Sequence, residues 1–205
     1  MIVIRRPWEI IRANVRTYAA VNVVIYGSLF LAFVLGAAFP RLADAGLGAM
    51  TAFASTSPLG GQVESAPESS IPVLAGVILI STLVFGALGM ATIPSLLIPC
   101  AGVIVHIAFA FLLGLTYAPQ DADGWVVFGA HLPTLLLELQ GYILVLLGSV
   151  LLARYWLHPR AHGLATRRAG YIRGLVESAW LYVPALVVLV AGAVYEAIEF
   201  LVILA

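Results

Sequence analysis

The sequence predicts an all-α polytopic membrane protein with five transmembrane helices and one short cytoplasmic interfacial helix. Of its 205 residues, 62% are hydrophobic and only 10% are charged, whereas a soluble domain carries about 25% charged residues. Nine of the ten basic residues, all arginines, fall in two stretches beside the apolar segments. Such stretches are typical of cytoplasmic segments. They contain Arg5, Arg6, Arg12, Arg16, Arg154, Arg160, Arg167, Arg168 and Arg173.

The first predicted span covers residues 18–39. The chain carries no charge from Thr17 to Pro40, and a spanning helix needs about 20 apolar residues. The preceding arginines, the length of the apolar run and the lack of a small-residue cleavage site favour a retained signal anchor over a cleaved signal peptide.

Residues 40–70 are predicted to form an external loop, because serine, proline, glycine and acidic residues are mixed there. A loop of this length without strong periodicity is either functional or mobile. We expect it to pack partly on the bundle through Leu47, Met50 and Phe53 and to provide a surface for a partner.

The next apolar stretch is long enough for two spans. No Asp, Glu, Lys or Arg occurs between residues 69 and 120. Pro94 suits the start of a helix and Ser95 can cap one, so the break is expected at residues 92–95. The two spans are then residues 71–91 and 95–117.

The last two spans are predicted at residues 126–153 and 180–204. Residues 154–179 between them are basic, with apolar residues at helical spacing, which indicates a cytoplasmic loop carrying a short interfacial helix. Its arginines at 154, 160, 167, 168 and 173 are expected to contact lipid headgroups and to fix topology.

Together these segments predict a cell-membrane protein whose N-terminus is cytoplasmic and whose C-terminus lies outside. Both arginine stretches then face the cytoplasm. Glu64, Glu68, Asp121 and Asp123 then lie outside.

Five ionisable residues fall inside the predicted spans, where charge is costly. Helical spacing places His131 and Glu138 on one face, and Glu196 and Glu199 on another. We expect Glu138 to pair with His106 near the midplane and His131 to face Glu196. Buried hydrogen bonds between helices, a relay or ligand cavity, and a metal site all remain open. The cluster is His106, His131, Glu138, Glu196 and Glu199.

Composition excludes several classes of function. The net charge is zero, so nothing indicates a nucleic-acid partner. Cys100 is the single cysteine, which allows no intrachain disulfide and argues against a metal site built on thiolates. No cofactor is predicted.

Four segments of the sequence carry a family resemblance. They are the basic lead into the first span, WEIIRANVRTYAAVNVVIYGSLFLAFVLGAAFP, and the segments VFGALGMATIPSLLIPCAGVIVH, HLPTLLLELQGYILVLLGSVLLAR and PALVVLVAGAVYEAIEFLVILA. In this order they resemble the N-terminal part, the glycine-rich second hairpin, the His, Glu and Gly motif and the last span of the stage II sporulation protein M family of integral membrane proteins. The chain departs from the family pattern at residues 99–102 and 130–133.

The resemblance implies a non-catalytic membrane scaffold. The expected partners are the lipid bilayer, other membrane or envelope proteins and a second copy of the chain. Two alternatives stay open. One is a transporter or permease subunit that moves a proton, ion or small solute past the His/Glu cluster. The other is an intramembrane metal-dependent enzyme. A continuous water path would favour transport, and a dry, locked cluster would favour the scaffold.

Overall fold

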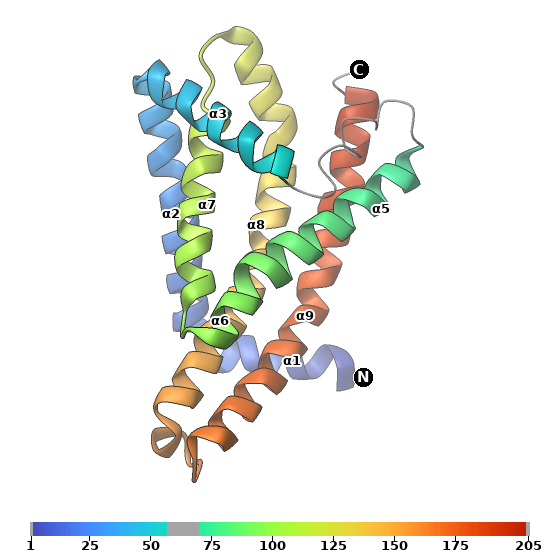
Figure 1. The fold of residues 1–205 in the computed structure, drawn as a ribbon. Helices are drawn as coiled ribbons and strands as arrows, with labels where there is room; N and C mark the ends of the chain where they lie inside the picture. The colour runs from blue at the N-terminus through green and yellow to red at the C-terminus, as the bar shows by residue number, and fades with distance from the viewer. Residues whose placement is uncertain (1, 57–69, 204–205) are drawn as a thin grey trace.

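The computed structural model describes residues 2–56 and 70–203, and these residues form helices joined by short turns, without any strand. Figure 1 shows their arrangement. The elements are α1 (Ile2–Ala13), α2 (Val15–Ala38), α3 (Pro40–Thr56), α5 (Ile71–Ser81), η2 (Thr82–Thr92), α6 (Ile93–Leu97), α7 (Ala101–Thr116), α8 (Ala122–Leu157), η3 (Pro159–His162), α9 (Arg167–Ile198) and η4 (Glu199–Ile203).

Four helical segments in the described part of the chain are long and apolar enough to cross a membrane. They are Val15–Ala38, Ile71–Leu97, Ala122–Leu157 and Arg167–Ile203. The α7 helix is equally apolar but has 16 residues, which gives a length of about 24 Å. The described residues therefore confirm the predicted all-helical fold class with apolar helices of membrane-spanning length.

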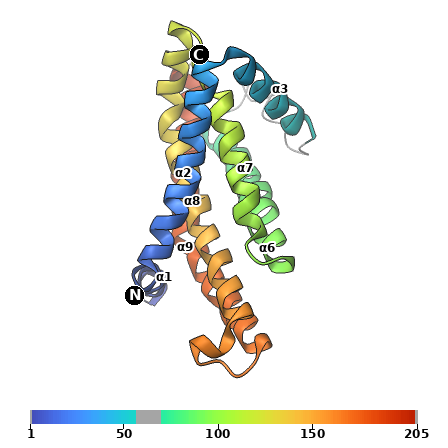
Figure 2. The same cartoon turned by 90° about the vertical axis from the view of Figure 1, so that its left-hand side faces the viewer.

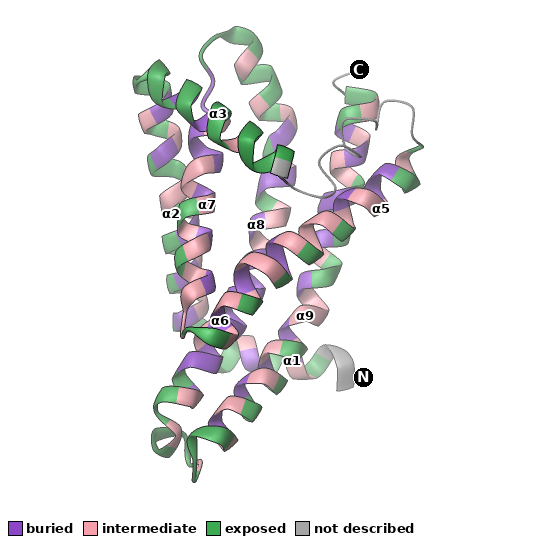
Figure 3. Ribbon diagram, viewed as in Figure 1, coloured by how far each residue is buried: buried purple, intermediate pink, exposed green. Residues whose placement is uncertain are grey.

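The bundle is built around α8. Every residue from Gly141 to Ser149 is buried, so this stretch is surrounded on all sides rather than on one face (Figure 3). The α9 helix runs back along α8 as the second arm of a long hairpin, while α2 and α7 pack on its other side (Figures 1 and 2). Leu139, Ile143 and Leu146 are fully buried within this core.

Polar side chains join the helices inside this apolar core. The Tyr26 hydroxyl on α2 donates to the carbonyl oxygen of Leu136 on α8 at 3.0 Å. Ser28 on α2 donates to the carbonyl oxygen of Ile107 on α7 at 2.9 Å. Hydrogen bonds of this kind between helices satisfy polar groups that have no water to bind in an apolar environment.

The arginines are sorted to one end of the bundle. The α1 helix, the start of α2, the end of α8 and the start of α9 lie at the lower end in Figure 1. These elements and the α8–α9 turn carry nine of the ten arginines. The opposite end carries Arg41 and Asp44 on α3, Asp121 in the α7–α8 turn, and Asp123 in the first turn of α8.

The helix that lies across the bundle is α1, which the sequence reasoning did not identify. It runs roughly perpendicular to α8 and α9 in Figure 1 and is seen end-on in Figure 2. Ile10 is buried against Leu147 and Leu151 of α8, while Arg5 and Trp8 are exposed. One apolar and one charged face is the pattern of a helix lying at an interface.

The separate interfacial helix predicted within residues 154–179 is wrong. The α8 helix continues to Leu157, a short turn follows, and α9 then runs unbroken from Arg167 through the predicted boundary at residue 180. The predicted span 180–204 is therefore part of a longer helical segment, Arg167–Ile203. The helix continues because its first turns pack on α8, where Gly170 and Gly174 allow the backbones to approach closely.

The first half of the predicted loop at residues 40–70 is a helix. The α3 helix covers Pro40–Thr56 and extends over the end of α7 (Figures 1 and 2). Of the predicted anchors, Met50 packs on the core and the Phe53 ring lies 6.2 Å from that of Phe109, but Leu47 is exposed. Gly46 instead contacts Leu115 closely.

Residues 57–69, which include Glu64 and Glu68 of the predicted loop, lie outside the described residues.

The break between the second and third spans lies at Ile98–Cys100 rather than at residues 92–95. The helix that starts at Ile71 passes through the π-helical stretch η2 and ends at Leu97. Pro94 sits at the start of α6 without ending the helix. Proline lacks the amide that would donate to the carbonyl oxygen four residues earlier. At Pro94 this bond is not needed, because the preceding stretch η2 has the wider π-helical hydrogen bonding. Cys100 adopts the left-handed conformation that turns the chain, with φ of 63°.

Ser95 does cap a helix, but the next one. Its hydroxyl accepts a hydrogen bond of 2.9 Å from the amide of Gly102 in the first turn of α7. A β-carbon on Gly102 would overlap the Ala91 carbonyl oxygen and lie 2.7 Å from Ser95 Oγ. The α6–α7 turn therefore requires a residue without a side chain at position 102.

Gly102→Ala is expected to destabilise the protein by about 1–3 kcal/mol, because the added methyl group must displace backbone in a tightly packed turn. Gly76→Ala is the matched control. No atom lies within 4 Å of a β-carbon at that position, so alanine is expected to stabilise α5 by about 0.5–1 kcal/mol. Unfolding curves in detergent check both. Equal curves for the two variants would contradict the close approach at Gly102.

Candidate functional site: a buried histidine and glutamate cluster

His131, Thr134 and Glu199 form a buried hydrogen-bonded group between α8 and η4. The Glu199 carboxylate accepts hydrogen bonds from His131 Nδ1, at 2.9 and 3.1 Å, and from the Thr134 hydroxyl, at 2.9 Å. All three side chains are at least 95% buried. The Tyr117 ring stacks on the His131 imidazole with 4.4 Å between ring centroids. We call this group of His131, Thr134, Glu199 and Tyr117 the polar lock.

Local structure explains how the polar lock forms. His131 and Thr134 are three residues apart on α8, so they share one face. Glu199 is the first residue of the π-helical turn that ends α9. One turn earlier, the Tyr195 hydroxyl donates to the carbonyl oxygen of Ala130 at 3.0 Å. The end of α9 is thus fastened to α8 at two successive levels.

Two further carboxylates, Glu138 and Glu196, lie next to the polar lock. Glu138 is on α8 and Glu196 is on α9, close enough to interact electrostatically. A β-carbon at Gly192 would lie 3.7 Å from Glu138 Cγ, so the helices approach closely here. Both side chains are half-buried, and neither makes a hydrogen bond or ion pair within the described part of the chain. We call Glu138 and Glu196 the carboxylate pair.

His106 is fully buried on α7 and is not part of the polar lock. Its Nδ1 atom is 3.0 Å from the Gly102 carbonyl oxygen, and its ring packs edge-on against Tyr142 with 5.1 Å between centroids. Its Nε2 atom has no hydrogen-bond partner among the described residues. The side chain is therefore part of the packing between α7 and α8.

The structure brings together His131, Glu138, Glu196 and Glu199 as the sequence predicted, but both predicted pairings are wrong. His131 bonds Glu199 rather than Glu196, because Glu199, three residues further along α9, lies on the face that meets α8 at His131. Glu138 does not bond His106. Since α7 begins at Ala101 rather than at residue 95, His106 lies near the N-terminal end of that helix.

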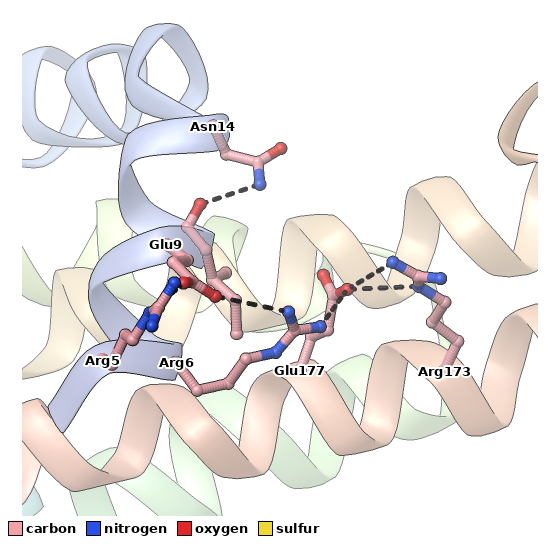
Figure 4. A network of polar contacts seen from close by, with 7 residues as sticks. Arg5, Arg6, Glu9, Asn14, Arg173 and Glu177 are labelled. Carbon is pink, nitrogen blue, oxygen red and sulfur yellow. Dashed lines mark hydrogen bonds and ion pairs between the residues drawn. The ribbon is translucent and has the colours of Figure 1, made fainter. Parts of the chain in front are cut away.

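A second buried carboxylate, which the sequence reasoning missed, lies at the basic end. Glu177 on α9 is 96% buried and accepts hydrogen bonds from Tyr155 at 2.8 Å and from Arg173 Nε at 3.1 Å. Arg6 of α1 lies 3.9 Å from the same carboxylate. Figure 4 shows Arg6 and Arg173 reaching Glu177 from opposite sides. The i,i+4 spacing of Arg173 and Glu177 was the signal available in the sequence.

This network changes the role expected for one arginine of the basic loop. Arg173 lies over the Tyr155 ring at 5.5 Å and pairs with Glu177, so its guanidinium is engaged within the protein. In the described part of the chain, the other arginines predicted to meet lipid headgroups make no ion pair. They are Arg154, Arg160, Arg167 and Arg168.

Chemically, the Glu199 carboxylate is engaged by His131 and Thr134, whereas the carboxylate pair has free acceptor capacity. Among the residues that the structure describes, no group of three His, Cys, Asp or Glu side chains is placed to hold a metal ion. No family model matches the chain, and neither a curated protein nor a solved structure matches it. The site therefore has to be interpreted from its own geometry.

Replacing Glu199 tests the polar lock. Glu199→Gln keeps an acceptor oxygen for Thr134 and is expected to cost about 1 kcal/mol. Glu199→Leu leaves two buried donors unpaired and is expected to cost at least about 3 kcal/mol. Unfolding in detergent measures both. A leucine variant as stable as the glutamine variant would show that the lock does not hold α9 to α8.

Replacing Glu138 by leucine should not destabilise the protein, in contrast to the same replacement at Glu199. Its carboxylate has no partner to leave unsatisfied, and burying it carries a desolvation cost. Glu138→Leu is therefore expected to leave the free energy of unfolding unchanged or to raise it by about 1 kcal/mol. A loss of about 3 kcal/mol in the same unfolding assay would reveal a partner for Glu138 and contradict this geometry.

Proposed function

We propose that the chain is a multi-pass integral membrane scaffold that holds other membrane or envelope proteins and carries out no catalysis. The hydrogen bonding of Glu199 is the observation that carries this proposal. Its carboxylate accepts hydrogen bonds from His131 and Thr134 and so fastens the end of α9 to α8, which suits a rigid frame. Similarity to the stage II sporulation protein M family is part of the same proposal.

In this proposal the chain crosses the cell membrane five times, because the shorter helix α7 crosses it in addition to the four long segments. The crossings are α2, the segment Ile71–Leu97, α7, α8 and α9. Two observations support an odd number of membrane crossings with a cytoplasmic N-terminus. The N- and C-termini lie at opposite ends of the bundle (Figure 1), and the arginines gather at the N-terminal end, which is then cytoplasmic. The α1 helix takes the place of the cytoplasmic interfacial helix.

The surface proposed to receive a partner is the outer face of α3. Leu42 and Leu47 are exposed there, at the end of the bundle opposite the arginines. Apolar side chains exposed beyond the spanning segments indicate a protein contact more readily than a lipid contact.

Topology is tested with single-cysteine labelling in intact cells. Cys100 is replaced by Ser in every variant, so that the introduced cysteine is the only thiol. Burial raises the pKa of the Cys100 thiol, so the native cysteine would itself react slowly with a maleimide. Ala161→Cys in the α8–α9 turn should be protected from a membrane-impermeant maleimide, and Ala52→Cys on α3 should be labelled. Ala161 is chosen over Gly163, whose φ of 70° would strain a cysteine. Labelling of position 161 in intact cells would reverse the proposed orientation.

The scaffold proposal is tested by affinity capture in mild detergent followed by mass spectrometry. The double variant Leu42→Gln, Leu47→Gln should lose the proteins recovered with the unaltered chain, because its apolar contact surface is removed. Leu157→Gln is the control, since Leu157 is equally exposed but lies at the basic end. Unchanged recovery with the double variant would contradict a partner surface on α3.

A proton or cation pathway is the second candidate, and the carboxylate pair favours it. Unpaired acidic side chains within a span commonly mark an ion pathway. If Glu138 and Glu196 carry protons, proteoliposomes containing the chain will dissipate a pH gradient, and Glu138→Gln with Glu196→Gln will abolish this. The scaffold proposal predicts gradients equally stable in the presence and absence of the protein.

A further inference from the structure

The junction of α1 and α2 leaves hydrogen-bond donors without acceptors. The chain bends at Asn14, whose side chain donates to the Ile10 carbonyl oxygen at 2.9 Å and does not cap α2. The first amide groups of a helix have no acceptor within it, and their dipoles favour a bound anion. At α2 these amides belong to residues that line a cavity of about 400 Å³ formed by residues 13–17 and Arg154.

Thr17 is a buried polar side chain facing this cavity. It is 91% buried, it lines the cavity, and its hydroxyl makes no hydrogen bond with any described residue. A threonine within a helix usually bonds the carbonyl oxygen one turn earlier. A hydroxyl without a partner at the wall of a cavity is available to a ligand or water in that space.

Two arginines without ion-pair partners border the cavity. Arg16 on α2 and Arg154 on α8 come from distant parts of the chain and line the same space. The acidic residues near this end do not neutralise them, because Glu9 is paired with Arg5 and Arg6, and Glu177 with Arg173 (Figure 4). The cavity is thus positively charged, and no described acid balances it.

An apolar groove leads from the cavity along the helices. A second cavity of about 350 Å³ shares Arg16, Thr17 and Arg154 with the first. It continues toward the middle of the bundle between α2, α7 and α8. Its remaining lining residues are Ala20, Val21, Val24, Val103 and Val150. A charged mouth followed by an apolar groove at the end of a spanning helix matches the shape and chemistry of a phospholipid.

We infer that Arg16, Arg154, Thr17 and the first turn of α2 bind the phosphate of one anionic phospholipid, whose acyl chain lies in the groove formed by Val24, Val103 and Val150. This inference rests on the proposed membrane location. It goes beyond general attraction of basic residues to lipid headgroups, because it assigns a single site with both a phosphate and a chain position. The bound lipid joins α2 to α8 at the cytoplasmic end.

Native mass spectrometry of the detergent-purified chain tests the site. The probes are phosphatidylglycerol and phosphatidylcholine with identical acyl chains, glycerophosphoglycerol without acyl chains, and inorganic phosphate. The unaltered chain should retain one phosphatidylglycerol, bound at least tenfold more tightly than phosphatidylcholine. The double variant Arg16→Gln, Arg154→Gln should weaken phosphatidylglycerol binding roughly 20-fold, since each arginine contributes to binding the anion.

Two other variants separate the site from general charge. Arg12→Gln with Arg168→Gln removes two charges from the same end, at residues that line neither cavity, and should change the affinity by less than about threefold. Val24→Trp fills the groove from its exposed side, so it should weaken lipid binding while leaving binding of glycerophosphoglycerol unchanged. Thermal unfolding without lipid confirms that each variant is folded.

Each contrary result overturns a defined part of the inference. Equal losses in the two double variants, or equal retention of both lipids, would show that no specific site exists. Inorganic phosphate binding as tightly as phosphatidylglycerol would show an anion site without a lipid. Alkaline extraction of the membranes is run in parallel. A chain released by it would overturn the proposed membrane function, whereas a chain that stays but prefers neither lipid overturns only the lipid site.

Discussion

The burial of α8 on all sides is the constraint on which the rest of the structure depends. A helix with no solvent-facing or lipid-facing side along Gly141–Ser149 must be covered by several neighbours at once. Glycines at the contacts allow α8 and α9 to approach each other closely enough for this burial. Gly141 lies against Leu189, Gly148 against Ser178, and Gly174 against Leu152. Dispersion contacts at this density hold helices together where lipid offers no hydrophobic penalty for separation.

Once α8 is enclosed, its polar side chains need partners from the surrounding helices. His131 and Thr134 find one in Glu199, and Gln140 is bonded to Tyr18. Glu138 finds none. The difference matters because an unpaired carboxylate in an apolar setting is costly and persists chiefly where it serves a purpose. The same cluster thus combines a group that rigidifies the bundle with a pair of carboxylates able to accept a proton or a cation.

The two ends of the bundle are built on different principles. At the basic end, Glu177 binds α1 to the α8–α9 hairpin through Arg6, Arg173 and Tyr155. This leaves Arg16 and Arg154 free for a ligand. At the opposite end few charges occur, and α3 is held by apolar contacts and by the close approach of Gly46 to Leu115. Internal pairing of some charges therefore determines which others can meet lipid or a partner.

The sequence by itself determined the all-helical class, the apolar spans and the sorting of arginines, because these depend only on composition and on the order of charged and apolar runs. Helical spacing also placed His131 with Glu138, and Glu196 with Glu199, on shared faces. Only the tertiary structure decided that these two faces meet, which of their side chains bond, and that His106 lies apart from them. No local signal in the sequence announces the π-helical stretches η2 and η4. Packing on α8 decided that α9 continues past residue 180 and that α1 lies across the bundle. The left-handed turn at Cys100 and the Ser95 cap decided that α7 starts at Ala101.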